Sequence, residues 1–184
     1  RFLVAICLLA GAAPRAASAE RPNFLWITCE DISPNLGCYG DAQAHTPNLD
    51  RLAGRSIRYT RAFAPTGVCA TARSSLIMGM YASSIGSQHM RCTTTLPGSI
   101  RPFPTYLRRA GYFCTNQSKQ DYNFATPEDA WDVGKGAGAH WKHRKPGQPF
   151  FAVFNYTDTH ESRIRGKTRN RIRLTAAESH DPST

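Results

Sequence analysis

The chain has 184 residues, and 41% of them are hydrophobic, which is enough for a sizeable core in one domain or in part of a larger one. Lysine and arginine outnumber aspartate and glutamate by 23 to 13, which gives a formal net charge of +10. No apolar run reaches the length that crosses a bilayer, so the composition excludes a membrane-spanning helix.

The first residues have the features of a secretory leader. An apolar run over residues 2–13 follows Arg1, and Ala17-Ser18-Ala19 matches the small-residue pattern of a cleavage site. We therefore expect residues 1–19 to be a signal peptide and the mature chain to be exported, either periplasmic or secreted.

The number of cysteines is compatible with an oxidising compartment, whether or not they form disulfides. Five cysteines follow the leader, namely Cys29, Cys38, Cys69, Cys92 and Cys114. If Cys69 has a chemical role, the other four can form two disulfides or none. No Cys-x-x-Cys spacing occurs, which argues against a zinc site.

Residues 21–29, with the sequence R-P-N-F-L-W-I-T-C, are apolar and β-branched in the manner of a buried, central parallel strand. Glu30 and Asp31 follow it, at the carboxyl end, where open α/β sheets place their sites. Adjacent carboxylates repel each other unless a cation neutralises them, and hard oxygen ligands select Ca²⁺ or Mg²⁺. The pair is therefore a candidate metal site, with two solvated loop acids as the alternative.

The sequence of residues 46–54 predicts a helix, whose role is expected to be packing. Thr46 is a typical N-cap residue, Pro47 suits the first helical position, and a glycine closes the segment. Residues 57–63 then indicate an extended segment, which leads into a turn at residues 65–67.

A second helix begins in the string C-A-T-A-R-S-S-L-I-M-G over residues 69–79. Apolar residues recur at every fourth position and can bury one face, namely Ala72, Leu76 and Met80. Cys69 and Arg73 then stack near the amino end. Unpaired N–H groups make that end electropositive, and an arginine fork suits a tetrahedral oxyanion such as sulfate or phosphate. A half-buried structural cysteine beside a solvated arginine is the alternative.

The loop over residues 81–102 is rich in Ser, Gly and Thr and carries His89 and Arg91. His89 is a minor candidate for a substrate contact; more often such a histidine is only a polar filler. A short helix over residues 104–110 follows, closed by a glycine, and then a strand over residues 112–115.

Two further polar residues lie just beyond strands. Lys119 follows the strand at residues 112–115, and a lysine in such a place is usually only part of the surface. After a loop over residues 124–147, residues 149–156 form the clearest strand of the second half, which leads to His160. This histidine can act as an acid or serve a structural role.

Two basic runs supply most of the net charge. They comprise Lys142, Arg144 and Lys145, and then Arg163, Arg165, Lys167, Arg169, Arg171 and Arg173. Such runs usually form a solvated surface or tail, although they can also attract a polyanion such as a sulfated glycan. Nucleic acid is a weaker candidate, because the runs lack interleaved aromatic residues and the leader indicates export.

Several of these strings together resemble the type I sulfatase family. The string at residues 69–79 is similar to the signature Cys-x-Pro/Ala-Ser/Ala-Arg, in which the cysteine is oxidised to formylglycine; it departs from it at Thr71 and Met78. The string T-P-N-L-D-R-L-A and the Pro-Phe-Phe strand before a histidine-containing turn also resemble the family.

Other family positions are matched with substitutions. The segment C-E-D-I-S-P-N-L-G-C-Y-G-D resembles the family's first metal pair, with Glu30 in place of an aspartate. The segment G-Y-F-C-T-N-Q-S-K-Q-D-Y-N aligns Lys119 with a sulfate-contacting lysine and puts Asp121 where histidine is common. The strings E-D-I-S-P, S-K-Q-D-Y-N and T-H-E-S look closest to a glycan or heparan N-sulfatase-like branch.

The resemblance implies an α/β fold of the alkaline-phosphatase-like kind, a three-layer sandwich with a mostly parallel sheet, here truncated. Residues 20–162 would be the N-terminal part of the catalytic domain, and residues 163–184 a basic polar tail or the start of a truncated segment.

The resemblance also implies a sulfuric ester hydrolase. Its catalytic residues would be Cys69, Arg73, Lys119 and His160, and its metal ligands Glu30, Asp31 and the modified Cys69. The cofactors would be Ca²⁺, or Mg²⁺, and the formylglycine at Cys69, made by a formylglycine-generating or anaerobic sulfatase-maturating enzyme. The substrate would be a sulfated carbohydrate or another sulfate ester. The alternatives are a phosphodiesterase or phosphonate hydrolase of the same superfamily, and an inactive secreted fragment that binds sulfated polysaccharide.

Overall fold

The computed structural model describes residues 21–136 and 138–164. The predicted leader at residues 1–19 and nearly all of the second basic run lie outside the described residues. The helices and strands, in chain order, are β1 (Phe24–Cys29), α1 (Pro47–Ala53), α2 (Cys69–Met78), α3 (Phe103–Arg109), β2 (Phe113–Gln117) and β3 (Phe150–Tyr156). Short 3₁₀ helices cover Gly37–Tyr39, Ala82–Ile85, Trp141–His143 and Glu161–Ile164. The α/β class is confirmed.

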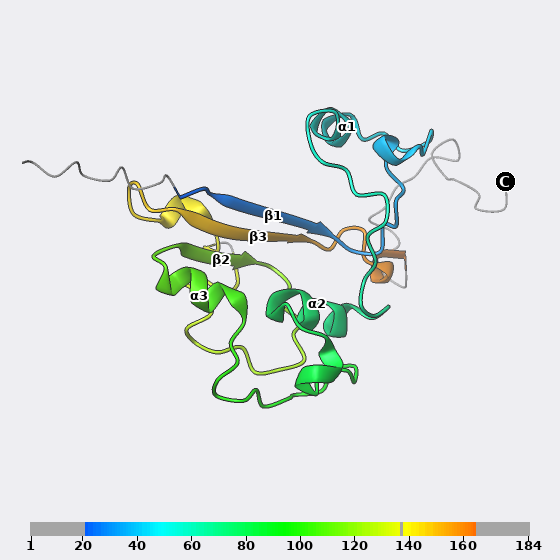
Figure 1. The fold of residues 1–184 in the computed structure, drawn as a ribbon. Coiled ribbons are helices and arrows are strands. Elements are labelled where there is room, and N and C mark those ends of the chain that lie inside the picture. The colour runs from blue at the N-terminus through cyan, green and yellow to red at the C-terminus, as the bar shows by residue number, and fades with distance from the viewer. Residues whose placement is uncertain (1–20, 137, 165–184) are drawn as a thin grey trace, which may run out of the picture.

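The three strands form a parallel sheet in the order β1-β3-β2. Helices α2 and α3 lie along one face of the sheet, with the amino end of α2 near the carboxyl ends of the strands (Figure 1). Because parallel strands end at the same edge, segments that follow β1, β2 and β3 meet there. This edge is the place where the predicted site residues gather.

The position of β1 differs from the prediction of a buried, central strand. Among the described strands, β1 pairs only with β3 and lies at an edge. Leu25 and Ile27 are 52% and 57% exposed. A continuous apolar run is typical of a strand with both faces covered, but it does not specify which neighbours cover them. The predicted parallel pairing of β1 is confirmed, whereas its predicted burial is wrong.

An aromatic cluster under the sheet forms the centre of the core. The ring of Phe151, in β3, lies 6.0 Å from Trp26, 5.1 Å from Phe103 and 5.9 Å from Trp131, measured between centroids. These residues come from β1, α3 and the loop after β2. The cluster therefore joins the sheet to the helical layer that carries the site.

We expect Phe151→Ala to lower the free energy of unfolding by about 3 to 5 kcal/mol, because Phe151 is only 5% exposed and its loss leaves a cavity among three rings. Urea denaturation followed by tryptophan fluorescence measures the change. Phe63→Ala is the matched control: Phe63 is 88% exposed, so its replacement should change the same quantity by less than about 0.5 kcal/mol. Equal effects of the two substitutions would contradict the core as described.

Helix α2 buries a different face from the one predicted. Its buried residues are Ala70, Thr71, Ser74, Ser75, Ile77 and Met78, whereas Leu76 is 50% exposed. The hydroxyl of Ser74 donates to the Ala70 carbonyl at 2.8 Å and accepts the backbone N–H of Asn123 at 2.8 Å. The small Ser74 side chain, with its hydroxyl satisfied, lets the loop at Asn123 pack directly on the helix. The apolar spacing alone did not reveal this polar face.

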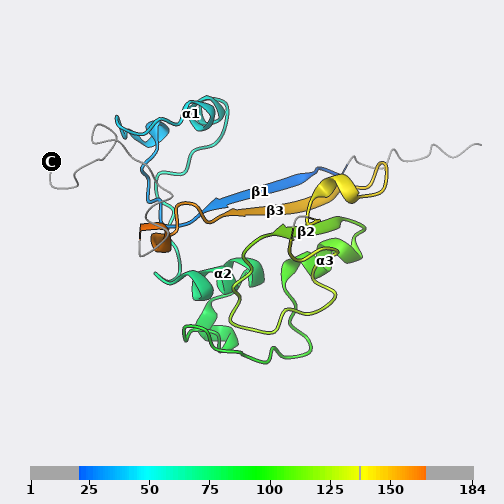
Figure 2. The ribbon, with the colours of Figure 1, turned by 180° about the vertical axis from the view of Figure 1, so that it is seen from behind.

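Helix α1 and the 3₁₀ helix Gly37–Tyr39 stand together apart from the sheet, as Figure 2 shows from behind. The helix begins at Pro47 as predicted, but Thr46 makes no side-chain capping bond. The Thr46 hydroxyl instead donates to Asp50 Oδ1 at 3.0 Å and accepts the Gly37 N–H at 2.9 Å, which ties α1 to the 3₁₀ helix. Residues 57–63 form no strand in the described structure.

The cysteines within the described residues, namely Cys29, Cys38, Cys69, Cys92 and Cys114, are free thiols. Cys114 lies in the core of β2 and is fully buried. Burial, followed by the negative charge of Asp132, raises the pKa of the Cys114 thiol to about 12. Cys114 is therefore a structural residue.

No helix among residues 21–136 and 138–164 is long and apolar enough to cross a membrane.

Candidate active site

Three of the predicted site residues converge on the carboxylate of a fourth, Glu30, which follows β1 and is 8% exposed. Lys119 Nζ lies 2.8 Å from Glu30 Oε2, and His160 Nε2 lies 3.5 Å from the same oxygen. Arg73 Nη1 lies 3.7 Å from Oε1. These residues come from the ends of all three strands and from α2. The cluster is a buried acid surrounded by basic groups at the carboxyl edge of the sheet.

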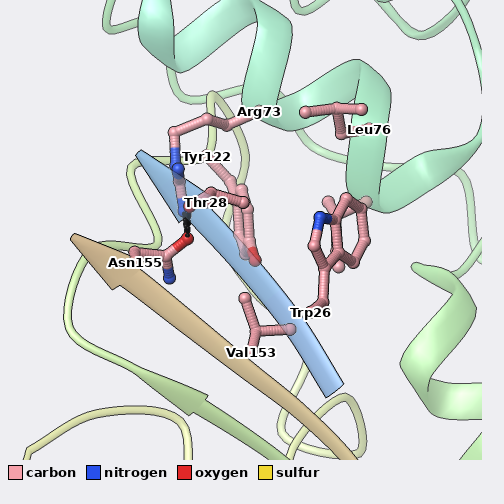
Figure 3. Close-up of a pocket in the computed structure, with 8 residues that line it drawn as sticks. Trp26, Thr28, Arg73, Leu76, Tyr122, Val153 and Asn155 are labelled. Carbon is pink, nitrogen blue, oxygen red and sulfur yellow. Dashed lines mark hydrogen bonds between the residues drawn. The ribbon is translucent and has the colours of Figure 1, made fainter. Parts of the chain in front are cut away.

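Arg73 is held by its surroundings rather than left in solvent. Its Nε donates to the Gln120 carbonyl at 2.8 Å, and its Nη2 donates to Asn155 Oδ1 at 2.8 Å and to the Lys119 carbonyl. Thr28 Oγ1 donates to the same Asn155 oxygen at 2.7 Å. Figure 3 shows Arg73 pointing toward Asn155 across a small pocket between α2 and the strands. The guanidinium is thus preorganised before any anion binds.

Asn155 is a site residue that the sequence analysis missed. Its amide nitrogen donates to Asn116 Oδ1 at 3.2 Å and to the carbonyls of Gln117 and Lys119 at 3.0 Å each. These bonds fasten the segment after β2, which carries Lys119, to the end of β3. The available signal was a polar amide near the end of the otherwise apolar strand P-F-F-A-V-F-N-Y.

The surroundings of Lys119 favour its protonated, positively charged form. Burial disfavours the ammonium, but the hydrogen bond and charge of Glu30, followed by the charges of Cys69 and Asp121, outweigh burial and raise the pKa of Lys119 above its ordinary value of 10.5. An ammonium held beside the cleft stabilises an anion more effectively than one in bulk water.

Cys69 joins the same network of contacts through Asp121. The thiol is the first residue of α2, and its Sγ lies 3.4 Å from Asp121 Oδ2. The same carboxylate oxygen lies 3.5 Å from Lys119 Nζ. Asp121, which replaces the family's common histidine and received no role from the sequence, therefore lies between the thiol and the ammonium. The structure brings Cys69, Arg73, Lys119, His160 and Glu30 into one connected network.

The ring of His160 is oriented by the turn that follows β3. Its Nδ1 accepts the backbone N–H of Ser162 at 3.2 Å and contacts the Ser162 hydroxyl at 2.8 Å. Because Nδ1 acts as an acceptor, the proton of the neutral ring belongs on Nε2, which faces Glu30. His160 is therefore placed to hold a proton at the cleft, whereas His89, the minor candidate, lies exposed on its loop.

The predicted metal ligands are only partly assembled. Asp31 is exposed, and its Oδ2 accepts the backbone N–H of Glu161 at 3.0 Å. Within the described ranges, no group of three or more His, Cys, Asp or Glu side chains could hold a metal. Glu30 Oε1, however, is a buried oxygen without a hydrogen-bond partner. A hard divalent cation would satisfy that oxygen, so Glu30 fits the predicted role of a ligand.

The chain is similar in sequence to known sulfatases. The sulfatase family model matches residues 22–134, more than half of the chain. An ulvan-active sulfatase of Formosa agariphila is 43% identical over 155 residues, which cover 78% of this chain and 26% of that protein. Human iduronate 2-sulfatase is 31% identical over 119 residues, which cover 64% of this chain and 22% of that protein. The chain spans about a quarter of the length of these relatives.

Two solved structures share the fold. One is a protein in complex with its substrate D-glucosamine-2-N,6-O-disulfate, with 20% identity, a TM-score of 0.65, and coverage of 77% of this chain and 35% of that one. The other is a 2-O GAG sulfatase, with 17% identity, a TM-score of 0.64, and coverage of 79% and 36%. The expected alkaline-phosphatase-like fold is confirmed. With the family model matching across β1, α2 and β2, the chain belongs to the sulfatase family.

Proposed function

We propose that this protein is a sulfuric ester hydrolase that acts on a sulfated carbohydrate, through a formylglycine derived from Cys69 and with a divalent metal. The observation that carries the proposal is the network of Arg73, Lys119 and His160 around the buried Glu30 carboxylate, beside Cys69 at the amino end of α2. A guanidinium and an ammonium that converge on one cleft suit a tetrahedral anion. The names of the relatives, which refer to ulvan, iduronate and a disulfated glucosamine, support a sulfated saccharide.

Each residue of the network has a distinct task in this proposal. Arg73 and Lys119 bind the sulfuryl oxygens and stabilise the charge that develops on them. His160, in its doubly protonated imidazolium form, donates the Nε2 proton to the departing alcohol and returns to the neutral ring. Formylglycine at Cys69 would, when formed and hydrated, supply the hydroxyl that attacks sulfur, and the bond from sulfur to the departing alcohol breaks as the new bond forms.

Glu30 and Asp31 would hold the divalent ion, for which Ca²⁺ is our first candidate and Mg²⁺ the second. The ion, when bound, supplies a Lewis acid that polarises the sulfuryl oxygens. Calcium takes about six to eight oxygen ligands, so the two carboxylates account for only part of its shell.

We infer three further properties from the sequence, namely the export of the protein, its domain bounds and the enzyme that processes Cys69. Residues 1–19 direct export to the periplasm or the exterior, residues 20–162 are the N-terminal part of the catalytic domain, and residues 163–184 form a basic polar tail or the start of a further segment. A formylglycine-generating or anaerobic sulfatase-maturating enzyme is the processing partner of Cys69.

The proposal is tested with protein co-expressed with a formylglycine-generating enzyme. We expect peptide mass spectrometry to find an aldehyde in place of the Cys69 thiol, and we expect hydrolysis of 4-nitrophenyl sulfate in preference to 4-nitrophenyl phosphate and bis(4-nitrophenyl) phosphate. Preference for a phosphate ester would favour the phosphodiesterase alternative. An unmodified thiol, together with retention on heparin and no hydrolysis, would favour the inactive polysaccharide-binding alternative.

A further inference from the structure

Arg91 lies on a loop that is fastened over the first turn of α2. The side-chain amide of Asn123, which is 1% exposed, donates to the carbonyls of Ser87 and His89 at 2.8 Å each. Thr71 Oγ1, in the first turn of α2, lies 3.5 Å from the Gln88 carbonyl. These contacts hold the loop beside the helix end that carries Cys69.

The guanidinium of Arg91 reaches the edge of the candidate active site. Its Nη1 lies 3.4 Å from Asp121 Oδ1, while the second oxygen of that carboxylate lies 3.4 Å from Cys69 Sγ. A single carboxylate therefore separates Arg91 from the cysteine. The side chain of Arg91 is 69% exposed, whereas that of Asp121 is 17% exposed. Arg91 thus contacts the network from the solvent side, outside the group of residues around Glu30.

The backbone of both partners is unusual. Arg91 has a φ of +56° and Asp121 a φ of +49°, in the left-handed region that non-glycine residues seldom occupy. Such conformations persist where the surroundings impose them, and they concentrate at functional sites. Here they occur on the two residues whose side chains meet at the solvent side of the network.

Stability gives no sufficient reason for this pairing, because an exposed ion pair contributes little to folding. A guanidinium has five N–H donors, and the described contact with Asp121 uses one of them. The solvent-facing donors can receive a planar or tetrahedral anion in a forked geometry. Arg91 is therefore suited to bind an anionic group that enters from the solvent next to the Cys69 end of the cleft.

We propose that Arg91 forms a second anion subsite, which binds a further sulfate or carboxylate group of the substrate while the scissile sulfate lies at Cys69, Arg73 and Lys119. The inference rests on the proposed function and adds a substrate class to it: saccharides that carry at least two anionic groups close together. A contrasting interpretation is that Arg91 only neutralises Asp121, in which case it would aid every sulfate ester equally.

Calorimetric binding to the Cys69→Ala protein, which cannot turn over its ligands, separates these interpretations. The probes are phenyl sulfate, 3-carboxyphenyl sulfate and benzene-1,3-diyl disulfate, which differ only in the second anionic group. At low ionic strength we expect one or both dianionic probes to bind about tenfold more tightly than phenyl sulfate, the effect of one charge-assisted hydrogen-bonded contact. The better of the two identifies the second anion as sulfate or carboxylate.

Adding Arg91→Ala should reduce this preference to less than about twofold, because the donor fork is gone. Arg109→Ala is the matched control: Arg109, the last residue of α3, is 63% exposed and its Nη2 lies 3.3 Å from Asp129 Oδ2, so its loss should leave the preference unchanged. Urea denaturation of each variant confirms that the fold is retained.

Each of the other outcomes contradicts either the second anion subsite or the proposed function. If the dianionic probes gain nothing over phenyl sulfate, or if the gain survives Arg91→Ala, the second subsite is wrong while the sulfate site stands. If Arg91→Ala weakens all three probes equally, Arg91 only neutralises Asp121. If phenyl sulfate itself does not bind, the proposed function fails before the subsite is considered.

Discussion

Cys69→Ala should abolish sulfate ester hydrolysis, lowering kcat by at least about 10⁴-fold in protein co-expressed with a formylglycine-generating enzyme. Alanine has no sulfur to be oxidised, so the proposed nucleophile cannot form. Arg73 and Lys119 keep their contacts with Glu30, so the variant should still bind phenyl sulfate. Hydrolysis of 4-nitrophenyl sulfate and calorimetric binding measure the two quantities separately.

The matched control for this experiment is Cys38→Ala. Cys38 is also half-buried, but it lies in the 3₁₀ helix beside α1, and the described contacts of this residue are made by its backbone. Its replacement should leave kcat within about twofold of the parent, as expected for a substitution away from the site. Full activity of Cys69→Ala would refute the role of this cysteine, and equal losses in both variants would point to a general requirement for thiols.

Arg73→Ala should lower the free energy of unfolding by about 3 kcal/mol. The Arg73 side chain is only 11% exposed, and it donates to Asn155 and to the carbonyls of Lys119 and Gln120. Its removal leaves these acceptors without a donor and leaves Glu30 with one cation fewer. The loss of stability is measured by urea denaturation, and the accompanying loss of anion affinity by calorimetry with phenyl sulfate.

Two variants test the physical reason for that loss. Arg73→Lys keeps the charge but lacks the planar fork, so it should recover only part of the lost stability. Arg109→Ala removes an exposed ion pair and should change the free energy of unfolding by less than about 0.5 kcal/mol. A wild-type unfolding midpoint for Arg73→Ala would mean that Arg73 does not bridge α2, the segment after β2 and the end of β3.

Local patterns in the sequence were enough to locate most of the elements and most of the chemistry. The apolar runs that became β1 and β3, the Pro47 helix start and the short helix before β2 depend on neighbouring residues, so their positions could be predicted. The string C-A-T-A-R and its spacing to the other matched segments indicated Cys69 and Arg73 as candidate site residues and pointed to the sulfatase family.

Some local expectations failed because a distant partner competed for the same group. Thr46 was expected to cap α1, but its hydroxyl bonds to Asp50 and Gly37 instead. The apolar spacing of α2 indicated Leu76 as buried, whereas the helix buries Ser74 against the loop at Asn123. In both cases a hydrogen bond to another segment decided the outcome, and spacing within the helix carries no information about it.

By itself, the sequence determined the family, the order of the elements and the residues that we propose to bind and attack a sulfate ester. Only the tertiary structure decided that β1 is an edge strand among the described strands, that Asn155 links Arg73 to the Lys119 segment, and that Asp121 stands between Cys69 and Arg91. The physical reason is that these contacts join residues far apart in the chain. Their formation depends on how strands and loops meet at one edge of the sheet, which no local periodicity encodes.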